Sequence, residues 1–523
     1  MDRRRFLSAA AGALAAGSAP RAGAAESPRR GGTLKAIGIE PGSFDPHLSP
    51  AEATALVSSL VRRTLFKLGA GARAGESALI PDLALKVESS RDGRLQTLTL
   101  RPGVRWENRT PVRGREVVAA DVKYSLERVL RRSPHAGLLG PVEAVEAPNR
   151  HLVRVHLTEP FAPFLSSLAE PWTAILPREV EDRAGDHHAV EALIGCGPFT
   201  LERFEPGIKA AFVRNHDYHA KGLPLLDRVE WLFITDRATQ LSLFRAGQVD
   251  LPSHDARVSR PEALEARRWH PTALIATWDG LSVRRLALRC DRPPLHDVRV
   301  RRALSLAVAR RRWVAEHLDG QGIEDAGPVP AALHEWKLPG RALGDGARWL
   351  GHDPALARRL LAEAGHAAGL RLRCGVAPDA GTEAMAELKR LAACLRDIGV
   401  DLQAAPEEPG RADETSWGAG PAASEVDGHL YAPYRSGRPG NRSMVANPRM
   451  DALLEGQRRA LTRRDRKWLV DDIQRLAADQ VHYLFTPAPR LFACWAPWVR
   501  QYQPRTSMDR GAQLEGVWIS RRS

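Results

Sequence analysis

A strand–helix–strand pattern between residues 370 and 405 constrains the fold more than any other feature. Residues 370–376 and 400–405 have the length and composition of buried strands, and residues 383–399 between them show the apolar spacing of a helix that ends at Gly399. Two strands joined through a helix pair in parallel with a right-handed crossover. The pattern therefore predicts a Rossmann-like α/β lobe in this part of the chain.

A helix with strong boundary signals precedes this pattern. Asp353 is a favourable N-cap residue, Pro354 suits the first helical position, and Gly365 ends a run whose leucines fall on one face. Nearer the N-terminus the patterns mix strand and helix. We predict strands at 33–39, 94–104 and 151–160, and helices at 51–68 and 119–132, the last with Asp121 in its first turn.

The first residues have the composition of an export signal. Arg3 and Arg4 precede Phe6 and Leu7, and a weakly apolar stretch then leads to small residues ending at Ala24. The stretch is too short and too poor in large apolar residues to span a bilayer. We predict that residues 1–25 are a twin-arginine signal peptide, cleaved near Ala24, and that the mature protein is periplasmic. The alternative is the basic start of a surface helix.

The charge distribution and the cysteine spacing argue against a nucleic-acid-binding surface and against a zinc site. The net charge is +14 and the pI is near 10.0, but the basic residues are mainly arginines scattered among acids, so we predict no nucleic-acid partner. The five cysteines form no CxxC pair, which argues against a zinc site. An odd number of cysteines leaves at least one thiol free in an exported protein.

Catalytic motifs are missing from the sequence. No GxSxG elbow occurs, and Glu335 in "LHEWK" lacks the second histidine of an HExxH zinc motif. The histidine pairs at 187–188 and 216/219 fall in predicted loops. We therefore predict no catalytic residue, no cofactor and no protein-ligated metal.

Several blocks together resemble one known family, the family 5 extracellular solute-binding proteins of ABC importers for dipeptides, oligopeptides and nickel chelates. Their order and spacing also resemble the family. The blocks are "GGTLKAIGIEPGSFDPHLS" (31–49), "LRPGVRWENRTPVRGREVVAADVKYSLERV" (100–129), the segment 194–251, "RPPLHDVRVRRALSLAVARR" (292–311), "WLGHDPALARRLLAEAG" (349–365) and the segment 447–480.

The resemblance implies a bilobal α/β fold of the periplasmic-binding-protein type with an inserted α+β subdomain. We expect lobe I in residues 26–50, 170–270 and 485–523, the inserted subdomain in 51–169, and lobe II in 271–484. The implied function is that of a monomeric receptor that delivers a peptide-like, anionic or other small solute to the permease and ATPase subunits of an ABC importer by hinge closure. The alternative is an exported hydrolase or metal-dependent enzyme on a similar scaffold.

The resemblance also suggests which residues bind the solute. Ser43 and Phe44 lie in the block that resembles the ligand-facing loop of lobe I. Trp417 matches a tryptophan of peptide-binding members, but Gly420 stands where those members have the aspartate that pairs with the peptide amino group. Glu425 or Asp427 could substitute for it, or both could be solvated loop residues.

Arg289 is a second departure, because the family usually has asparagine at this position on the strand entering the cleft. A planar guanidinium binds carboxylate or phosphate oxygens in pairs. With the aspartate replaced by Gly420, Arg289 predicts a preference for anionic or amine-blocked solutes over free dipeptides. The alternative is a strand-edge arginine that reaches solvent.

Overall fold

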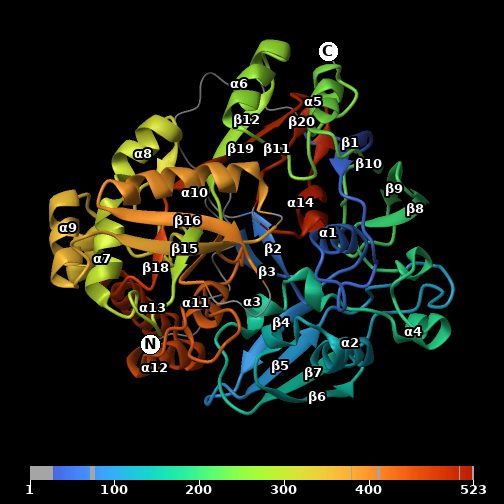
Figure 1. Ribbon diagram of the computed structural model, residues 1–523. Coiled ribbons are helices and arrows are strands. Elements are labelled where there is room, and N and C mark those ends of the chain that lie inside the picture. The colour runs from blue at the N-terminus through green and yellow to red at the C-terminus, as the bar shows by residue number, and fades with distance from the viewer. Residues whose placement is uncertain (1–26, 71–76, 379, 409–412, 506, 521–523) are drawn as a thin grey trace.

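The computed structural model describes residues 27–70, 77–378, 380–408, 413–505 and 507–520. Two bodies lie side by side in Figure 1. The first body, on the right, combines blue, green and red segments and therefore draws on both ends of the chain, whereas the second body, on the left, is yellow to orange. Within the described residues, no helix is long and apolar enough to cross a membrane.

Two sheets of the first body share one hydrophobic core. In one, β1 lies parallel to β10, and β9 and β8 follow in antiparallel order. In the other, β19 lies between β11 and β12 and also pairs with β14. The bounds are β1 Thr33–Gly38, β8 Phe199–Glu205, β9 Lys209–Arg214, β10 Arg228–Phe233, β11 Arg257–Val258, β12 Leu274–Asp279, β14 Gly322–Ile323 and β19 Ala488–Trp495, with helices α5 Arg237–Arg245 and α6 Arg260–Trp269. The predicted strand at 33–39 is confirmed by β1.

The helix predicted at 51–68 is wrong in its second half. Helix α1 (Glu52–Val61) ends at Val61, and strand β2 (Phe66–Ala70) begins five residues later. The reason lies in long-range contacts. The guanidinium of Arg62 donates to the carbonyls of Phe44, Ala192 and Ile194, which holds the chain in an extended conformation after α1.

A four-stranded antiparallel sheet forms the lower part of the first body in Figure 1. Its order is β4 (Ala84–Ser89), β5 (Leu95–Leu100), β7 (Leu152–Leu157) and β6 (Val142–Asn149), covered by α2 (Ala119–Arg132). The strand and helix predictions for these segments are confirmed. Asp121 accepts a hydrogen bond from the Val118 backbone N–H at 2.9 Å and pairs with Arg115, which fixes the start of α2.

The hydrophobic cores do not follow the limits expected for the inserted subdomain, 51–169. Residues of α1 such as Leu56 and Leu60 belong to the core of the first two sheets. The core of the antiparallel sheet instead begins at Leu65 and takes in Ile175, Ile194 and Cys196. The short elements in this region are β3 Ser77–Pro81, which pairs with β2, and helices α3 Phe164–Ser167 and α4 Arg178–Ala184.

The second body is built on one five-stranded sheet. Its order is β16 (Val400–Pro406), β15 (Leu370–Val376), β17 (Thr415–Ala419), β13 (Arg284–Leu288) and β18 (Tyr483–Phe485). Strands β15 and β16 are parallel and are joined by α10 (Gly381–Arg396), so the predicted strand–helix–strand unit is confirmed.

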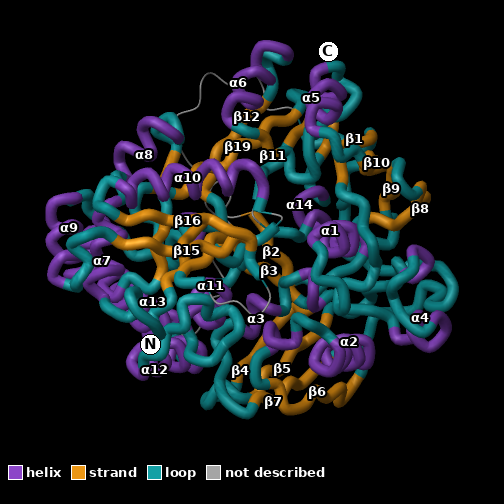
Figure 2. The backbone as a smooth tube through the Cα atoms, viewed as in Figure 1, coloured by secondary structure: helices purple, strands orange, loops and turns teal. Residues whose placement is uncertain are grey.

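Helices cover both faces of this sheet, as Figure 2 shows for α10 and α13. One core contains residues of α7 (Val298–Ala307), α9 (Pro354–Glu363) and α10, and a second core contains residues of α11 (Val426–Tyr434), α12 (Pro448–Arg459) and α13 (Arg463–Gln480). Helix α8 spans Arg310–His317. The Asp353 side chain accepts from the Leu356 N–H at 2.8 Å, which confirms the predicted cap of α9.

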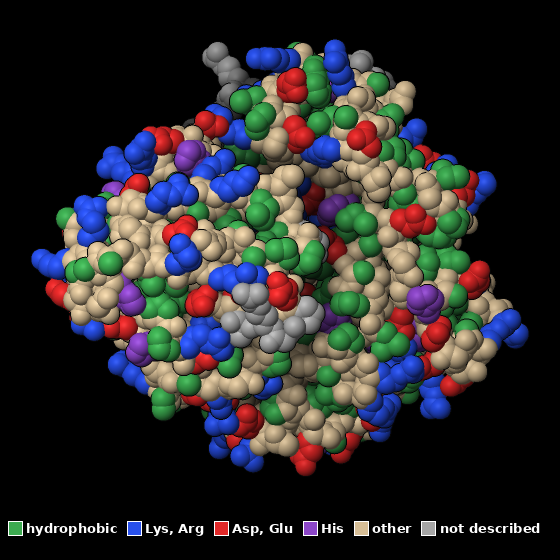
Figure 3. Space-filling view, in the orientation of Figure 1, with side chains coloured by type: hydrophobic (Ala, Val, Ile, Leu, Met, Phe, Trp, Pro, Cys, Tyr) green, Lys and Arg blue, Asp and Glu red, His purple; other side chains and the backbone are tan. Residues whose placement is uncertain are grey.

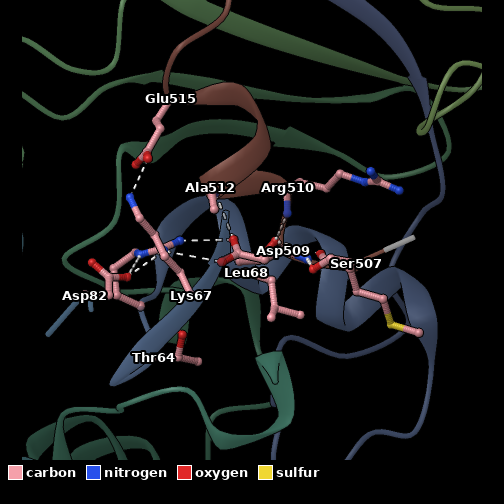
Figure 4. Close-up of polar contacts among 12 residues, drawn as sticks. Thr64, Lys67, Leu68, Asp82, Ser507, Asp509, Arg510, Ala512 and Glu515 are labelled. Carbon is pink, nitrogen blue, oxygen red and sulfur yellow. Dashed lines mark hydrogen bonds and ion pairs between the residues drawn. The ribbon is translucent and has the colours of Figure 1, made fainter. Parts of the chain in front are cut away.

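A buried charge network joins distant segments of the first body (Figure 4). Arg63 pairs with Asp82 at 2.5 Å and with Asp509 at 3.0 Å, and all three side chains are almost fully buried. Lys67 pairs with Glu515 in the same network. The network attaches α14 (Arg510–Leu514) to the segments around β2. The last strand pair, β20 (Val499–Arg500) with β21 (Trp518–Ile519), flanks α14 in the chain.

All five cysteines carry free thiols. Cys196, Cys374 and Cys494 are buried, and burial raises the pKa of each thiol above its usual value. Buried neutral thiols of this kind act as small apolar packing groups.

Candidate functional site

The carboxyl ends of three parallel strands of the second body meet at one edge of its sheet. Strands β15, β16 and β17 end there at Val376, Pro406 and Ala419, and antiparallel β13 begins there at Arg284. In Figure 1 the arrowheads of β15 and β16 point toward the first body. Ligands of open α/β sheets bind outside the carboxyl ends of the strands. This edge is therefore the candidate binding site.

The loop that leaves β17 reaches the first body. Ser424 in this loop donates to Glu170, and Figure 3 shows a groove between the two bodies with acidic and histidine side chains visible inside it. Burial is the main cause that raises the pKa of Glu170, and the negative charge of Glu425 adds to the rise, although the hydrogen bond from Ser424 opposes it. The loop from Gly420 to Glu425 thus lies at the boundary between the bodies.

A second set of contacts holds the bodies together at the outer end of α12. The Arg458 guanidinium carbon lies 3.8 Å from the centroid of the Tyr431 ring and 4.7 Å from that of Phe161, which belongs to the first body. The Arg458 carbonyl accepts from the Ala162 N–H at 2.6 Å, and Arg459 pairs with Glu159 at 2.7 Å.

Gly418 leaves space beside Arg285, and Gly420 lies close to the guanidinium group. Gly418 is directly opposite Arg285 in the β13–β17 register, and a Cβ at Gly418 would meet no described atom within 4 Å. A Cβ at Gly420 would lie 3.7 Å from the guanidinium carbon of Arg285. The same carbon lies 4.3 Å from the centroid of the Tyr483 ring. The guanidinium is thus held on a ring beside an open space.

Arg285 is a residue that the sequence interpretation missed. Its neighbour Arg284 pairs with Glu383 and Glu387, whereas Arg285 pairs with no carboxylate among the described residues. Strand alternation places Arg284 and Arg285 on opposite faces, which the sequence could have shown. The open space opposite Arg285 depends on the pairing with Gly418, and that register is not visible in the sequence.

Arg289 does not lie at this edge, so the expectation that it shares a solute with Gly420 is wrong. The Gly420 N–H donates to Val283 at 2.8 Å, whereas Arg289 donates to Glu414 at the other end of β17. Val283 and Arg289 are six positions apart in the chain, which corresponds to roughly 20 Å along a strand. The Arg289 guanidinium also donates to both carboxylate oxygens of Asp291, at 2.7 and 2.6 Å. Arg289 instead borders a separate pocket of about 570 Å³.

Trp417 lies in the core of the second body. Its side chain is 3 % exposed, and its indole N–H donates to the Ala384 carbonyl of α10 at 3.0 Å. Residues next to each other in a strand point to opposite faces. Trp417 therefore packs on the face opposite Arg285 and Gly418, and its side chain does not reach the open space there.

Glu425 and Asp427 are both committed to contacts within the second body. Glu425 accepts from the Asp427 N–H at 3.1 Å as the N-cap of α11 and also pairs with Arg466. Asp427 pairs with Arg458 at 3.3 Å, and burial raises its pKa. Neither carboxylate takes the place of the missing aspartate at Gly420.

Ser43 and Phe44 lie in a loop that joins the parts of the first body. The Ser43 carbonyl accepts from the Thr54 hydroxyl at 2.7 Å, and Phe44 packs edge-on against Phe204 in the first core. The next residue, Asp45, forms a buried ion pair with Arg128 of α2 at 2.6 Å. These contacts favour a structural role for the loop.

Comparison with known proteins identifies the family. The family model described as "Bacterial extracellular solute-binding proteins, family 5 Middle" matches residues 78–429. Two curated relatives are each 27 % identical to this chain. They are di/tripeptide-binding protein 2 of Pseudomonas aeruginosa, over 65 % of each chain, and the dipeptide-binding protein of Escherichia coli, over 62 % of each chain. The chain thus spans less than two thirds of the length of these relatives.

A solved structure shows the same architecture. The periplasmic binding protein DppA of Helicobacter pylori, in complex with the peptide STSA, superposes with a TM-score of 0.75 and 22 % identity, over 94 % of this chain and 99 % of that chain. The two bodies are therefore the lobes of a bilobal α/β periplasmic-binding-protein fold, the first body being lobe I and the second lobe II. The exported-enzyme alternative finds no support in these comparisons. The chain belongs to the family 5 bacterial extracellular solute-binding proteins.

Proposed function

We propose that this protein is the solute receptor of an ABC importer, which captures a peptide-like or other small solute between its lobes and presents it to the permease and ATPase subunits. The observation that carries the proposal is the position of the Gly420–Glu425 loop, which joins the carboxyl edge of the lobe II sheet to lobe I through Ser424 and Glu170. The relatives that bind dipeptides and tripeptides support a solute of this size.

Hinge closure is the motion that we propose for capture. The lobes touch through Arg458 and Phe161 and through Arg459 and Glu159, at the rim rather than through a shared apolar core. Domains that close on a ligand by rotating about a few connecting residues break and remake contacts of this kind. The protein acts as a monomer in this proposal.

The lobe limits remain part of the proposal. The limits expected from the sequence are 26–50, 170–270 and 485–523 for lobe I and 271–484 for lobe II. Because β12 (Leu274–Asp279) pairs with β19 of lobe I, we propose that lobe II begins at about residue 280 instead. The packing of α1 with lobe I moves the start of the inserted subdomain from 51 to about 64 and its end to about 196.

Export is proposed on the sequence of the first residues. Arg3, Arg4, Phe6, Leu7 and the cleavage region near Ala24 lie outside the described residues. Members of the family act in the periplasm or outside the cell, and a twin-arginine signal cleaved near Ala24 would take this chain to the periplasm.

The proposal is tested by identifying the bound solute and following closure. Protein purified from the periplasm of the native host is denatured mildly, and the released small molecules are identified by mass spectrometry. We expect one solute in near-stoichiometric amount, and small-angle scattering of refolded, solute-free protein should show a smaller radius of gyration when that solute is added. Protein that releases no solute and keeps the same scattering profile in the presence of cell extract would contradict the proposal.

A further inference from the structure

We infer that Arg285 binds an acidic group of the transported solute, most simply a carboxylate, in the open space over Gly418 at the carboxyl edge of the lobe II sheet. The inference deepens the proposed function and rests on it. A carboxylate bound there would give this edge of the sheet a preference for acidic over basic groups of the solute.

The first observation is the free binding capacity of Arg285. A guanidinium has five N–H donors, and those of Arg285 donate to no acceptor among the residues that the structure describes. The side chain is half-buried and lies 4.3 Å from the centroid of the Tyr483 ring. Stacking on an aromatic ring fixes the plane of the guanidinium while its edges stay available for two oxygens.

The second observation is the space in front of these donors. Gly418, opposite Arg285 in the sheet, is exposed, and the position that a Cβ would occupy there is open. At Gly420 a Cβ would lie 3.1 Å from the Val283 carbonyl oxygen and 3.7 Å from the guanidinium carbon of Arg285. A carboxylate side chain at position 420 would therefore occupy the place that we assign to the acidic group of the solute.

The third observation is the local charge. The nearest acids of the same lobe are neutralised, because Glu425 pairs with Arg466 and Asp427 pairs with Arg458. The ionisable groups that feel the charge of Arg285 are His429, Tyr434 and Tyr483. Burial lowers the pKa of His429 to about 4, and the charge of Arg285 adds to this effect. His429 and both tyrosines are therefore uncharged at neutral pH, and none of the described carboxylates of the lobe forms an ion pair with Arg285.

The experiment compares four probes on solute-free protein by titration calorimetry. N-acetyl-Ala-Ala and succinate carry carboxylates and no amine, Ala-Ala-amide carries an amine and no carboxylate, and Ala-Ala carries both. We expect N-acetyl-Ala-Ala to bind at least tenfold more tightly than Ala-Ala-amide. A charge-assisted hydrogen-bonded pair is worth about ten- to a hundredfold in affinity, so R285M should weaken the binding of N-acetyl-Ala-Ala by that factor.

Two further variants make the test specific. R289M is the matched control, because Arg289 directly follows β13 and its guanidinium is held by Asp291. The R289M variant should bind the four probes with the affinities of the wild type. G420D adds a carboxylate beside Arg285 and should weaken the two acidic probes as R285M does. Thermal melting of each variant shows whether it is folded. If R285M does not fold, the comparison of G420D with the wild type still tests the inference.

The outcomes separate this inference from the proposed function. Unchanged binding of N-acetyl-Ala-Ala by folded R285M and G420D, tighter binding of Ala-Ala-amide, or no binding of either acidic probe by the wild type overturns the inference. So does a co-purified solute that has no acidic group. In each of these cases the proposed receptor function still holds if the protein co-purifies with a solute and closes on it. If the protein neither co-purifies with a solute nor closes on one, the inference about Arg285 and the proposed receptor function are both overturned.

Discussion

At the scale of single residues, the buried histidines link stability to pH. His47 donates from Nε2 to the Ala174 carbonyl at 2.8 Å, and burial together with the charge of Arg128 lowers its pKa to about 3. In the unfolded chain the same group takes up a proton near pH 6.5. The unfolded state therefore binds more protons between these two values, and stability falls as the pH decreases from 6.5 toward 3.

We predict that His47→Gln flattens this dependence. At a difference of about 1.4 kcal/mol per pH unit, His47 alone should remove about 2 kcal/mol of unfolding free energy between pH 6.5 and pH 5. Urea unfolding followed at several pH values measures the slope. The control is His188→Gln, because His188 is exposed and follows the buried His187 in the chain. An equal slope in His47→Gln and the wild type would contradict the assignment of a buried neutral His47.

Arg285 and Arg289 illustrate what a residue type can and cannot predict. The sequence shows several arginines in and beside β13. Which of them lacks an ion-pair partner depends on the carboxylates that the fold places near each one. Asp291 occupies Arg289 from two residues away, whereas the surroundings of Arg285 come from Gly418 and from Tyr483, far along the chain. The sequence therefore shows that this strand carries arginines, but not which of them lacks an acidic partner.

At the scale of elements, α1 depends on two glycines that approach its last turn. A Cβ at Gly195 would lie 1.9 Å from the Val61 carbonyl oxygen, and the Gly197 N–H donates to that oxygen at 2.7 Å. We predict that Gly195→Ala lowers the unfolding free energy by about 3 kcal/mol, because backbone must move to admit the methyl group. Chemical denaturation gives the value.

The matched control for this prediction is Gly137→Ala. No described atom would lie within 4 Å of a Cβ at Gly137, and its φ is not in the left-handed region. The substitution should leave stability within about 0.5 kcal/mol of the wild type. Similar losses in both variants would show that the approach of Gly195 to α1 is not what makes the position sensitive.

Elements were predictable where their signals are local. The cap at Asp353 and the run from 370 to 405 specify helix and strands within a few residues, and both are confirmed. The segment 51–68 has equally regular apolar spacing, yet it divides into α1 and β2. The difference is that Arg62 and Arg63 are fixed by acceptors far away in the chain, such as Ala192 and Asp509.

At the scale of the whole molecule, we predict that export requires the paired arginines. Replacing Arg3 and Arg4 by lysine should leave the precursor in the cytoplasm, because the twin-arginine receptor distinguishes the guanidinium pair. Immunoblots of periplasmic and cytoplasmic fractions measure the distribution. The control replaces Arg29 and Arg30, which lie beyond the predicted cleavage site, by lysine. This variant should show the same distribution between periplasm and cytoplasm as the wild type. An unchanged periplasmic yield of the first variant would refute this route.

The partner of Arg63 also has a consequence for synthesis on the ribosome. Arg63 and Asp509 are 446 residues apart in the chain, and the lobe I core around α1 also contains late residues such as Trp495 and Leu514. Lobe II has all five strands of its sheet once Phe485 has emerged, whereas lobe I still lacks β19 and α14. A nascent chain therefore carries one finished lobe and one with unburied apolar surface, which general chaperones must cover until translation ends.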